Sequence, residues 1–492
     1  MSHFSILDGS IVGIYILVTM IAGLSVRKYV GKVEHFLVAG REMNVYLGIA
    51  SLAATEFGIV TCMYVAQNGY DKGFAGATPG ILSAIAMLIV GLTGFCIKPL
   101  RESGAITIPE LFQNRFGSNI RWLAGVVIVL AGLLNMGVFL RTGGEFLVYV
   151  CNFDPHYLEI TMTALLLGVA VYTILGGMLS VLVTDFLQFV VMSVGLLAVT
   201  MLILYRIGWE KLVTAVQAHY GAGGFNPFVH PEMGWPYVAL FAVQGLAAVI
   251  TWQTTIARVL AAKNAKTAGK IFTGTSFFFV CRFLLPAVWG IAALATLKPE
   301  MVAGNTLLAM PKFLSTFVPV GLMGVLVAAM LAADMSTDSS YMLTWTSVIY
   351  NDILAPFRKN WTEKRGLLIN RMIVALIGIF LLLYGLWYPL KDDLWTYLAV
   401  TGAICFSSIS VLLISCCYWR RANSWDAGSA IALGAIFQIS FLVMQQVPST
   451  MHIAKSIGPY YSGLAAYVFA ALGMIVGSLL KPAKKTAHGG IK

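Results

Sequence analysis

A long apolar stretch of the sequence, residues 318–350, contains the polar segment AADMSTDSS at residues 332–340. A run of about 20 apolar residues is long enough to cross the hydrocarbon core of a bilayer as a helix. Ionisable groups at that depth are costly and usually serve a function. The segment therefore predicts a transmembrane helix that carries a polar site, and the rest of the chain should supply its helical partners.

The composition agrees with a membrane protein. Of the 492 residues, 59% are hydrophobic and 11% are charged, whereas a soluble protein averages roughly 45–50% and about 25%. These values exclude a soluble enzyme, a DNA-binding domain and a disordered scaffold. The net charge of +11 is better explained by cytoplasmic retention of Lys and Arg than by a nucleic-acid partner. We expect an all-α polytopic membrane protein in a lipid bilayer.

Thirteen stretches qualify as membrane spans, and we number them 0 to 12. They are residues 10–24, 45–67, 74–97, 122–150, 158–175, 182–205, 237–259, 271–297, 318–350, 367–387, 394–419, 427–447 and 460–480.

The distribution of basic residues predicts the orientation of these spans. Alternate connections hold 23 of the 32 Lys and Arg residues, the opposite connections hold 7, and Arg141 and Arg282 lie inside spans. Because Lys and Arg are retained on the cytoplasmic side, the N-terminus should be outside and the C-terminus inside. A plasma membrane, such as the bacterial inner membrane, is the expected location.

Seven ionisable residues within the predicted spans are candidates for a functional role. They are Glu56, Arg141, Glu145, Asp185, Arg282, Asp334 and Asp338. Five acids against two bases leave an excess of negative charge, which requires protons or bound cations at membrane depth. The pattern therefore indicates coupling to Na⁺ or H⁺. Alternatively, Arg141 and Glu145 simply form a pair, because they are four residues apart on one helix.

Helical periodicity organises the segment at residues 332–340. Ala333, Ser336, Thr337 and Ser340 share one helical face, and their hydroxyl and carbonyl oxygens suit a small alkali cation. Asp334 and Asp338 form an adjacent stripe. Two like charges so close together indicate that one is protonated or that a cation lies between them.

Several short motifs resemble the sodium:solute symporter family, which includes bacterial proline and sialic acid carriers. They are FLVAGR at 36–41, TIPEL at 107–111, RFG at 115–117, GGM at 176–178, Thr184-Asp185 with Gln188, and WRRAN at 419–423. The likeness runs in order from span 0 to span 10. It implies a LeuT-like inverted repeat of five plus five helices, in which helices 1 and 6 are unwound at the midplane. The implied divisions are residues 1–44, 45–205, 206–421 and 422–492.

The resemblance also assigns ion ligands. The main sodium site would use the carbonyls of Ala54, Phe57 and Ala333 and the hydroxyls of Ser336 and Thr337. Some members have a second sodium site, and Asp185, Ser336, Ser339 and Ser340 fall on its positions. Sodium is thus the expected coupling ion, and no organic cofactor is expected.

The substrate should bind at the midplane, and its candidate contacts are Glu56, Thr61, Gln67, Ser83, Arg141, Trp252, Gln253 and Ser407. A bidentate Arg141–carboxylate pair would favour an organic anion or an amino acid. If Glu145 saturates Arg141, a neutral sugar or polyol is equally expected. Arg258 is placed at the membrane surface by its position at the end of span 6.

These observations predict a sodium-coupled secondary active symporter that imports a small polar solute as a monomer by alternating access. The alternative is a proton-coupled carrier that uses Glu56, Asp334 and Asp338. A membrane sensor would need an appended signalling domain, which we do not expect here. The sequence carries no HExxH or GxSxG motif, so an intramembrane enzyme is not expected.

Overall fold

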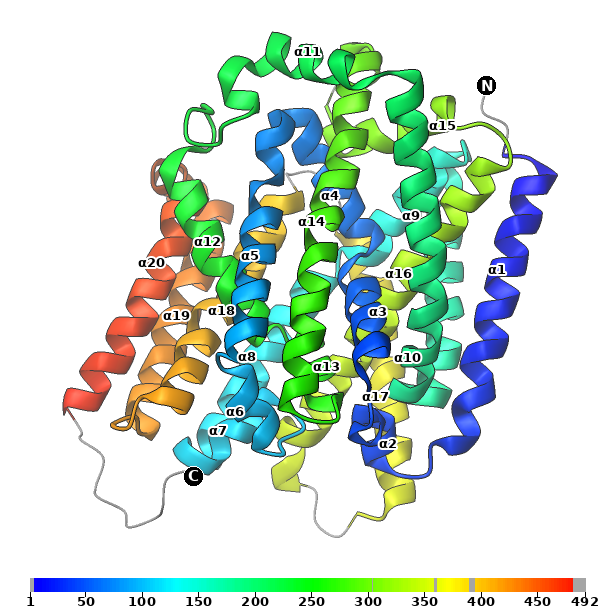
Figure 1. The fold of residues 1–492 in the computed structure, drawn as a ribbon. Helices are drawn as coiled ribbons and strands as arrows, with labels where there is room; N and C mark the ends of the chain where they lie inside the picture. Colours follow the sequence, from blue (N-terminus) through cyan, green and yellow to red (C-terminus); the bar gives the residue numbers. More distant parts are fainter. Residues whose placement is uncertain (1–3, 303, 358–360, 389–393, 481–492) are drawn as a thin grey trace.

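The computed structural model describes residues 4–302, 304–357, 361–388 and 394–480, and over these ranges it contains helices and no β-strand (Figure 1). The basic tail at residues 481–492 lies outside the described residues. The helices are α1 (Ile6–Ser25), α2 (Val33–Val38), α3 (Val45–Glu56), α4 (Ile59–Lys72), α5 (Thr78–Thr93), α6 (Ile97–Glu102), α7 (Ile108–Phe116), α8 (Ser118–Met136), α9 (Phe139–Val150), α10 (Leu158–Arg206), α11 (Trp209–Tyr220), α12 (Gly234–Thr251), α13 (Gln253–Ala261), α14 (Ala265–Thr296), α15 (Ala309–Phe317), α16 (Leu322–Val348), α17 (Glu363–Trp387), α18 (Leu394–Tyr418), α19 (Ser424–Gln446) and α20 (Met451–Leu480).

Within the described part of the chain, eleven helical segments are long and apolar enough to cross a membrane. This supports the expected all-α membrane protein. Two of the eleven segments each contain two predicted spans or parts of them. Residues 59–93 include α4 and α5, and residues 155–206 include the whole of α10.

Helix α10 is kinked in its interior. Its 49 residues would measure about 70 Å if straight, at ~1.5 Å per residue. Gly177 lies at the kink with φ 54° and ψ −148°, and an added Cβ there would lie 2.5 Å from the Phe36 ring. Only glycine combines that backbone conformation with such a close approach.

Two helical segments are interrupted near the centre of the protein. Helix α3 ends at Glu56 and α4 begins at Ile59, with Phe57 at φ −112° and ψ 75° between them. Helix α12 ends before Trp252, whose φ of −64° and ψ of 113° are non-helical, and α13 follows directly. The two segments are those in which the resemblance implies unwound helices.

Helix α16, which carries the polar segment, lies in the middle of the bundle. Nearly all of its residues are buried, and it packs against α10, α1, α3, α8 and α17. Helices α19 and α20 pack on each other and on α18 at one edge, and α1 lies at the opposite edge (Figure 1). Helix α11 crosses the end of the bundle to which α4 and α12 extend (Figure 1).

Helices α4 and α14 are in backbone contact. A Cβ added at Gly290 would lie 1.8 Å from the Ala66 carbonyl oxygen, and one added at Gly69 would lie 2.4 Å from the Ala287 carbonyl oxygen. Only residues without a Cβ permit this approach. The α4 half of the first interrupted segment is therefore fixed against α14.

Candidate functional site

A cavity of about 140 Å³ lies on the α4 and α12 side of the two interruptions. Glu56 and Trp252, one from each interruption, line this cavity together with Thr337 of α16. Residues of α4, α5, α8, α9, α12, α13, α14, α16 and α18 form the remaining walls. The cavity therefore meets both broken helices and the polar helix at one level.

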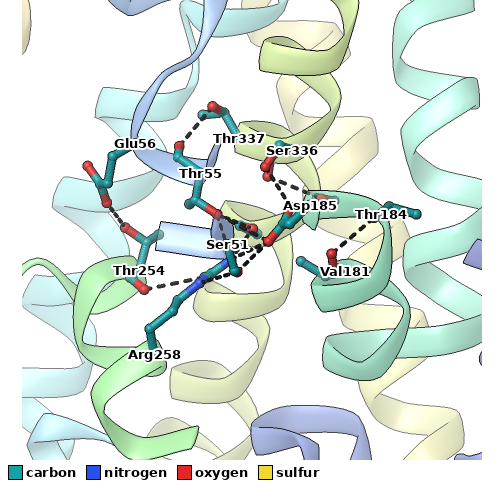
Figure 2. Close-up of polar contacts among 12 residues, drawn as sticks. Ser51, Thr55, Glu56, Val181, Thr184, Asp185, Thr254, Arg258, Ser336 and Thr337 are labelled. Carbon is teal, nitrogen blue, oxygen red and sulfur yellow. Dashed lines mark hydrogen bonds and ion pairs between the residues drawn. The ribbon is translucent and has the colours of Figure 1, made fainter. Parts of the chain in front are cut away.

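Glu56 connects the two interruptions. One carboxylate oxygen, Oε1, accepts hydrogen bonds from the hydroxyls of Thr254 and Thr255, each at 2.9 Å, and the Thr254 bond is visible in Figure 2. The other oxygen, Oε2, lies 3.3 Å from Arg282 Nη1. The two threonines begin α13, so the carboxylate also benefits from the helix dipole there.

Arg282 of α14 is the basic residue of the cavity wall. Its Nη2 contacts the Thr61 hydroxyl at 3.3 Å and the Tyr64 hydroxyl at 3.4 Å. The guanidinium lies over the rings of Phe279 and Phe283, 5.0 and 5.4 Å from their centroids, which is within cation–π range. Its Nε is buried and has no hydrogen-bond partner. The sequence identified Arg282 as an ionisable group within a span but did not place it among the substrate contacts.

Aromatic side chains form much of the cavity wall. The ring centroids of Tyr64 and Trp395 are 4.7 Å apart, and those of Phe241 and Trp395 are 5.0 Å apart. At the second interruption, Trp252 Nε1 donates a hydrogen bond of 2.9 Å to the Tyr341 hydroxyl. The wall is thus apolar, with polar groups at few positions, which is typical of small-molecule sites.

Of the predicted sodium-ligating side chains, Thr337 lies at the first interruption. The Thr337 hydroxyl donates a 2.9 Å hydrogen bond to the Thr55 carbonyl oxygen (Figure 2). A Cβ added at Gly58 would lie 2.8 Å from Thr337 Oγ1. Thr337 therefore lies directly against the break, where the Ala54 carbonyl oxygen accepts a 3.2 Å hydrogen bond from the Phe57 N–H. The buried Ala333 lies one helical turn away on the same helix.

Ser336 links the two predicted ion sites. Its hydroxyl donates a 2.6 Å hydrogen bond to Asp185 Oδ1, so in this structure it is directed toward the second set of ligands. Ser339, in contrast, donates to the Ser336 carbonyl of its own helix at 3.2 Å. Of the second set, Asp185, Ser336 and Ser340 are brought together.

Arg258 occupies the centre of that second set. It is fully buried, and its Nη2 donates to Asp185 Oδ2 at 3.1 Å (Figure 2). The same nitrogen donates to the hydroxyls of Thr55 and Ser340 at 2.6 Å each. Its Nε donates to the Ser51 hydroxyl at 3.1 Å. The expectation that Arg258 lies at the membrane surface is therefore wrong. Burial is tolerated because a carboxylate and three hydroxyls compensate the loss of water around the charge.

The eight predicted substrate contacts divide into two groups. Glu56, Thr61, Ser83 and Trp252 line the cavity, and Gln67, Arg141, Gln253 and Ser407 do not.

Local interactions account for three of the residues outside the cavity lining. Arg141 pairs with Glu145 at 3.0 Å and donates to the Gly385 carbonyl at 3.2 Å. The alternative interpretation of the sequence, an ion pair between Arg141 and Glu145 on one helix, is therefore the arrangement in the structure. Gln67 donates to the Thr306 hydroxyl, and Ser407 donates to a carbonyl of its own helix. Gln253 is buried with neither amide atom partnered.

Asp334 and Asp338 lie outside the cavity lining. Their exposures are 2% and 1%, and each has one carboxylate oxygen without a hydrogen-bond partner. Asp334 faces α9, because a Cβ added at Gly143 would lie 2.9 Å from Asp334 Oδ1. Each carboxyl group thus has a buried oxygen for which no hydrogen bond compensates the loss of water.

A helical membrane protein with a cavity between two broken helices has the architecture of a membrane transporter. Residues 36–434 match the model of the sodium:solute symporter family. The chain belongs to that family, as its motifs indicated.

Curated relatives and solved structures agree with this membership. The chain is 25% identical to sodium/glucose cotransporter 4 of Danio rerio over 90% of this chain and 72% of that protein. It is 25% identical to the sodium/myo-inositol cotransporter of Mus musculus over 96% and 73%. A Na⁺-coupled sialic acid symporter, solved in a substrate-bound outward-open state, has the same fold, with a TM-score of 0.81, 19% identity and coverage of 98% and 100%. MhsT, solved with L-phenylalanine, gives a TM-score of 0.54 at 12% identity over 89% and 98%.

Proposed function

We propose that this protein is a sodium-coupled secondary active symporter that imports a small polar solute by alternating access. The observation that carries the proposal is the position of Thr337. Its hydroxyl lies against the broken α3–α4 segment, and the residue also lines the cavity. A sodium ion bound there would contact the solute site directly, so that each ligand would favour binding of the other.

The architecture in this proposal has thirteen transmembrane helices. The kink of α10 at Gly177 supports two crossings within that helix. Residues 45–205 and 206–421 form two inverted five-helix repeats, each starting with an interrupted helix, and residues 1–44 and 422–492 flank them. The N-terminus is outside, the C-terminus is cytoplasmic, and a monomer in the plasma membrane is the functional unit.

The proposed sodium ligands are the carbonyls of Ala54, Phe57 and Ala333 and the hydroxyls of Ser336 and Thr337. Broken helices supply carbonyl oxygens for such ions. Entry of one sodium ion down the membrane potential provides about 2.3 kcal/mol per 100 mV. A second sodium at Asp185, Ser336, Ser339 and Ser340 would require the Arg258 guanidinium to withdraw from those oxygens.

The proposed solute contacts are Glu56, Thr61, Ser83 and Trp252, which all line the cavity. Their polar groups suit either a carboxylate-bearing solute or a sugar or polyol. The names of the relatives support the sugar or polyol, and Arg282 in the cavity wall supports the carboxylate.

A second candidate is a proton-coupled solute carrier. The buried carboxyl groups of Asp334 and Asp338, each with an unpartnered oxygen, favour it. Uptake that follows pH and ignores sodium would distinguish it from the first candidate.

The test of sodium coupling is the thermal stability of the purified protein in NaCl, KCl and choline chloride at equal ionic strength. We expect a saturable rise specific to sodium, equivalent to about 1.4 kcal/mol at ten times the dissociation constant. Thr337→Ala should lose it. Thr346→Ala is the matched control, because Thr346 of the same helix is buried and only bonds its own helix. Equal stability in all three salts would refute sodium coupling.

A further inference from the structure

Glu56 and Arg282 form a loose ion pair in the cavity. They are the charged side chains among the described residues of its lining. The Glu56–Arg282 distance is 3.3 Å, and the two hydroxyl contacts of Arg282 Nη2 are 3.3 and 3.4 Å. A strong charge-assisted hydrogen bond measures about 2.7–2.9 Å. The guanidinium therefore retains unused hydrogen-bonding capacity.

One edge of the Arg282 guanidinium combines a donor without a partner, Nε, with Nη2, which makes only the two long hydroxyl contacts. Arg282 Nη1 donates to Glu56 Oε2, whereas Nε has no partner although it is buried. The N–H groups of Nε and Nη2 point in parallel from the same edge of the planar guanidinium. This edge matches the two oxygens of a carboxylate. A buried donor without a partner carries a free-energy penalty, which a bound carboxylate would remove.

The charge balance of the cavity also favours a solute that carries a carboxylate. The Glu56–Arg282 pair is neutral overall, and a sodium ion at Thr337 would add one positive charge beside it. Because charges interact strongly in a cavity of low dielectric constant, a carboxylate on the solute would restore neutrality. The aromatic wall around Trp395 would then receive the apolar part of the solute.

We infer that the transported solute carries a carboxylate that binds the Nε–Nη2 edge of Arg282. The inference rests on the proposed symport function and narrows its substrate class. Arg141, which the sequence favoured for this role, takes no part because Glu145 already pairs with it.

The experiment measures melting temperatures of the full-length purified protein in NaCl with small probe molecules. Propionate and propionamide form one matched pair, and phenylacetate and phenylacetamide form a second pair with a larger apolar body. L-Alanine tests an added ammonium group, and D-glucose and myo-inositol test the polyol class. We expect a saturable shift with at least one carboxylate and roughly 10- to 100-fold weaker binding of its amide.

Two arginine variants locate the carboxylate. Arg282→Gln should abolish the rise in melting temperature with carboxylates, while the rise with sodium persists. Arg282→Lys keeps the positive charge but lacks the paired N–H donors of the guanidinium edge, so it should weaken carboxylate binding at least about tenfold. Arg141→Gln is the matched control and should bind as the wild type does. If Arg282→Gln does not fold, Arg282→Lys decides the question.

Three results would overturn the inference. The first is that a polyol stabilises the protein and no carboxylate does. The second is that no carboxylate raises the melting temperature of a protein that still responds to sodium. The third is that the carboxylate-dependent rise in melting temperature persists in both Arg282 variants. Loss of the sodium response in the wild type would instead refute the symport proposal, so the two failures are distinguishable.

Discussion

The buried ion pair between Asp185 and Arg258 permits a quantitative test of what holds the centre of the bundle together. Both side chains have 0% exposure, and their Oδ2–Nη2 distance is 3.1 Å. In Asp185→Asn, the Arg258 charge would remain buried among the hydroxyls of Ser51, Thr55 and Ser340. In Arg258→Met, the carboxylate would keep the Ser51 hydroxyl at 2.5 Å and the Ser336 hydroxyl.

Each single variant leaves one charge buried without its counter-ion. Breaking a buried pair in this way costs about 3–5 kcal/mol. The double variant Asp185→Asn/Arg258→Met leaves no buried charge, so its loss of stability should be smaller than the sum of the two single losses. We expect a coupling free energy of roughly 2–3 kcal/mol, at the upper end for contacting residues.

The assay is equilibrium unfolding of the purified protein in mixed micelles by titration with a denaturing detergent. The Arg141–Glu145 pair is a matched control, because its side chains are 22% and 12% exposed and lie four residues apart on one helix. Its coupling should be about 0.3–0.5 kcal/mol, as for ordinary helix pairs. Additive losses at Asp185 and Arg258 would refute the conclusion that their attraction offsets their burial.

Three further predictions follow from individual positions. Gly58→Ala places a Cβ 2.8 Å from Thr337 Oγ1, so it should remove the sodium-specific rise in melting temperature at a stability cost of about 1–3 kcal/mol. A variant that keeps the full sodium response would contradict the site. Glu56→Gln leaves Arg282 without its counter-charge, so carboxylate probes should stabilise this variant with less dependence on sodium, measured as the melting shift at low and high NaCl. Burial lowers the pKa of His230, in the α11–α12 connection. The unfolded chain therefore takes up the proton first as pH falls below about 6.5, and melting temperature between pH 7 and pH 5 should decline more in the wild type than in His230→Gln.

The membrane class and the helices could be predicted from the sequence because burial in lipid imposes long apolar runs. Helix α16 was found in this way, since its polar residues stand out against an apolar background. The first interruption had a local signal in Gly58. The second had only the polar run at residues 252–255, because Trp252 is a large residue with no intrinsic preference for a helix break.

The site residues were harder to predict because their partners are distant in the sequence. Arg141 and Glu145 pair within one helical turn, which periodicity can indicate. Arg258 meets Asp185 across 73 residues, and Arg282 meets Glu56 across 226. Hydropathy places such residues in or near a span but carries no information on the direction in which they point.

The glycine contacts between α4 and α14 also determine where spectroscopic labels would be informative. Since the two backbones touch at Gly69 and Gly290, neither helix can slide without breaking van der Waals contact along its length. Spin labels placed on α4 and α14 should give one narrow, unchanging distance distribution under every salt and solute condition. The same α4 label paired with one on α16 would report any movement of α4 relative to α16 in the proposed transport cycle. The α4–α14 pair would give the constant reference distance for that measurement.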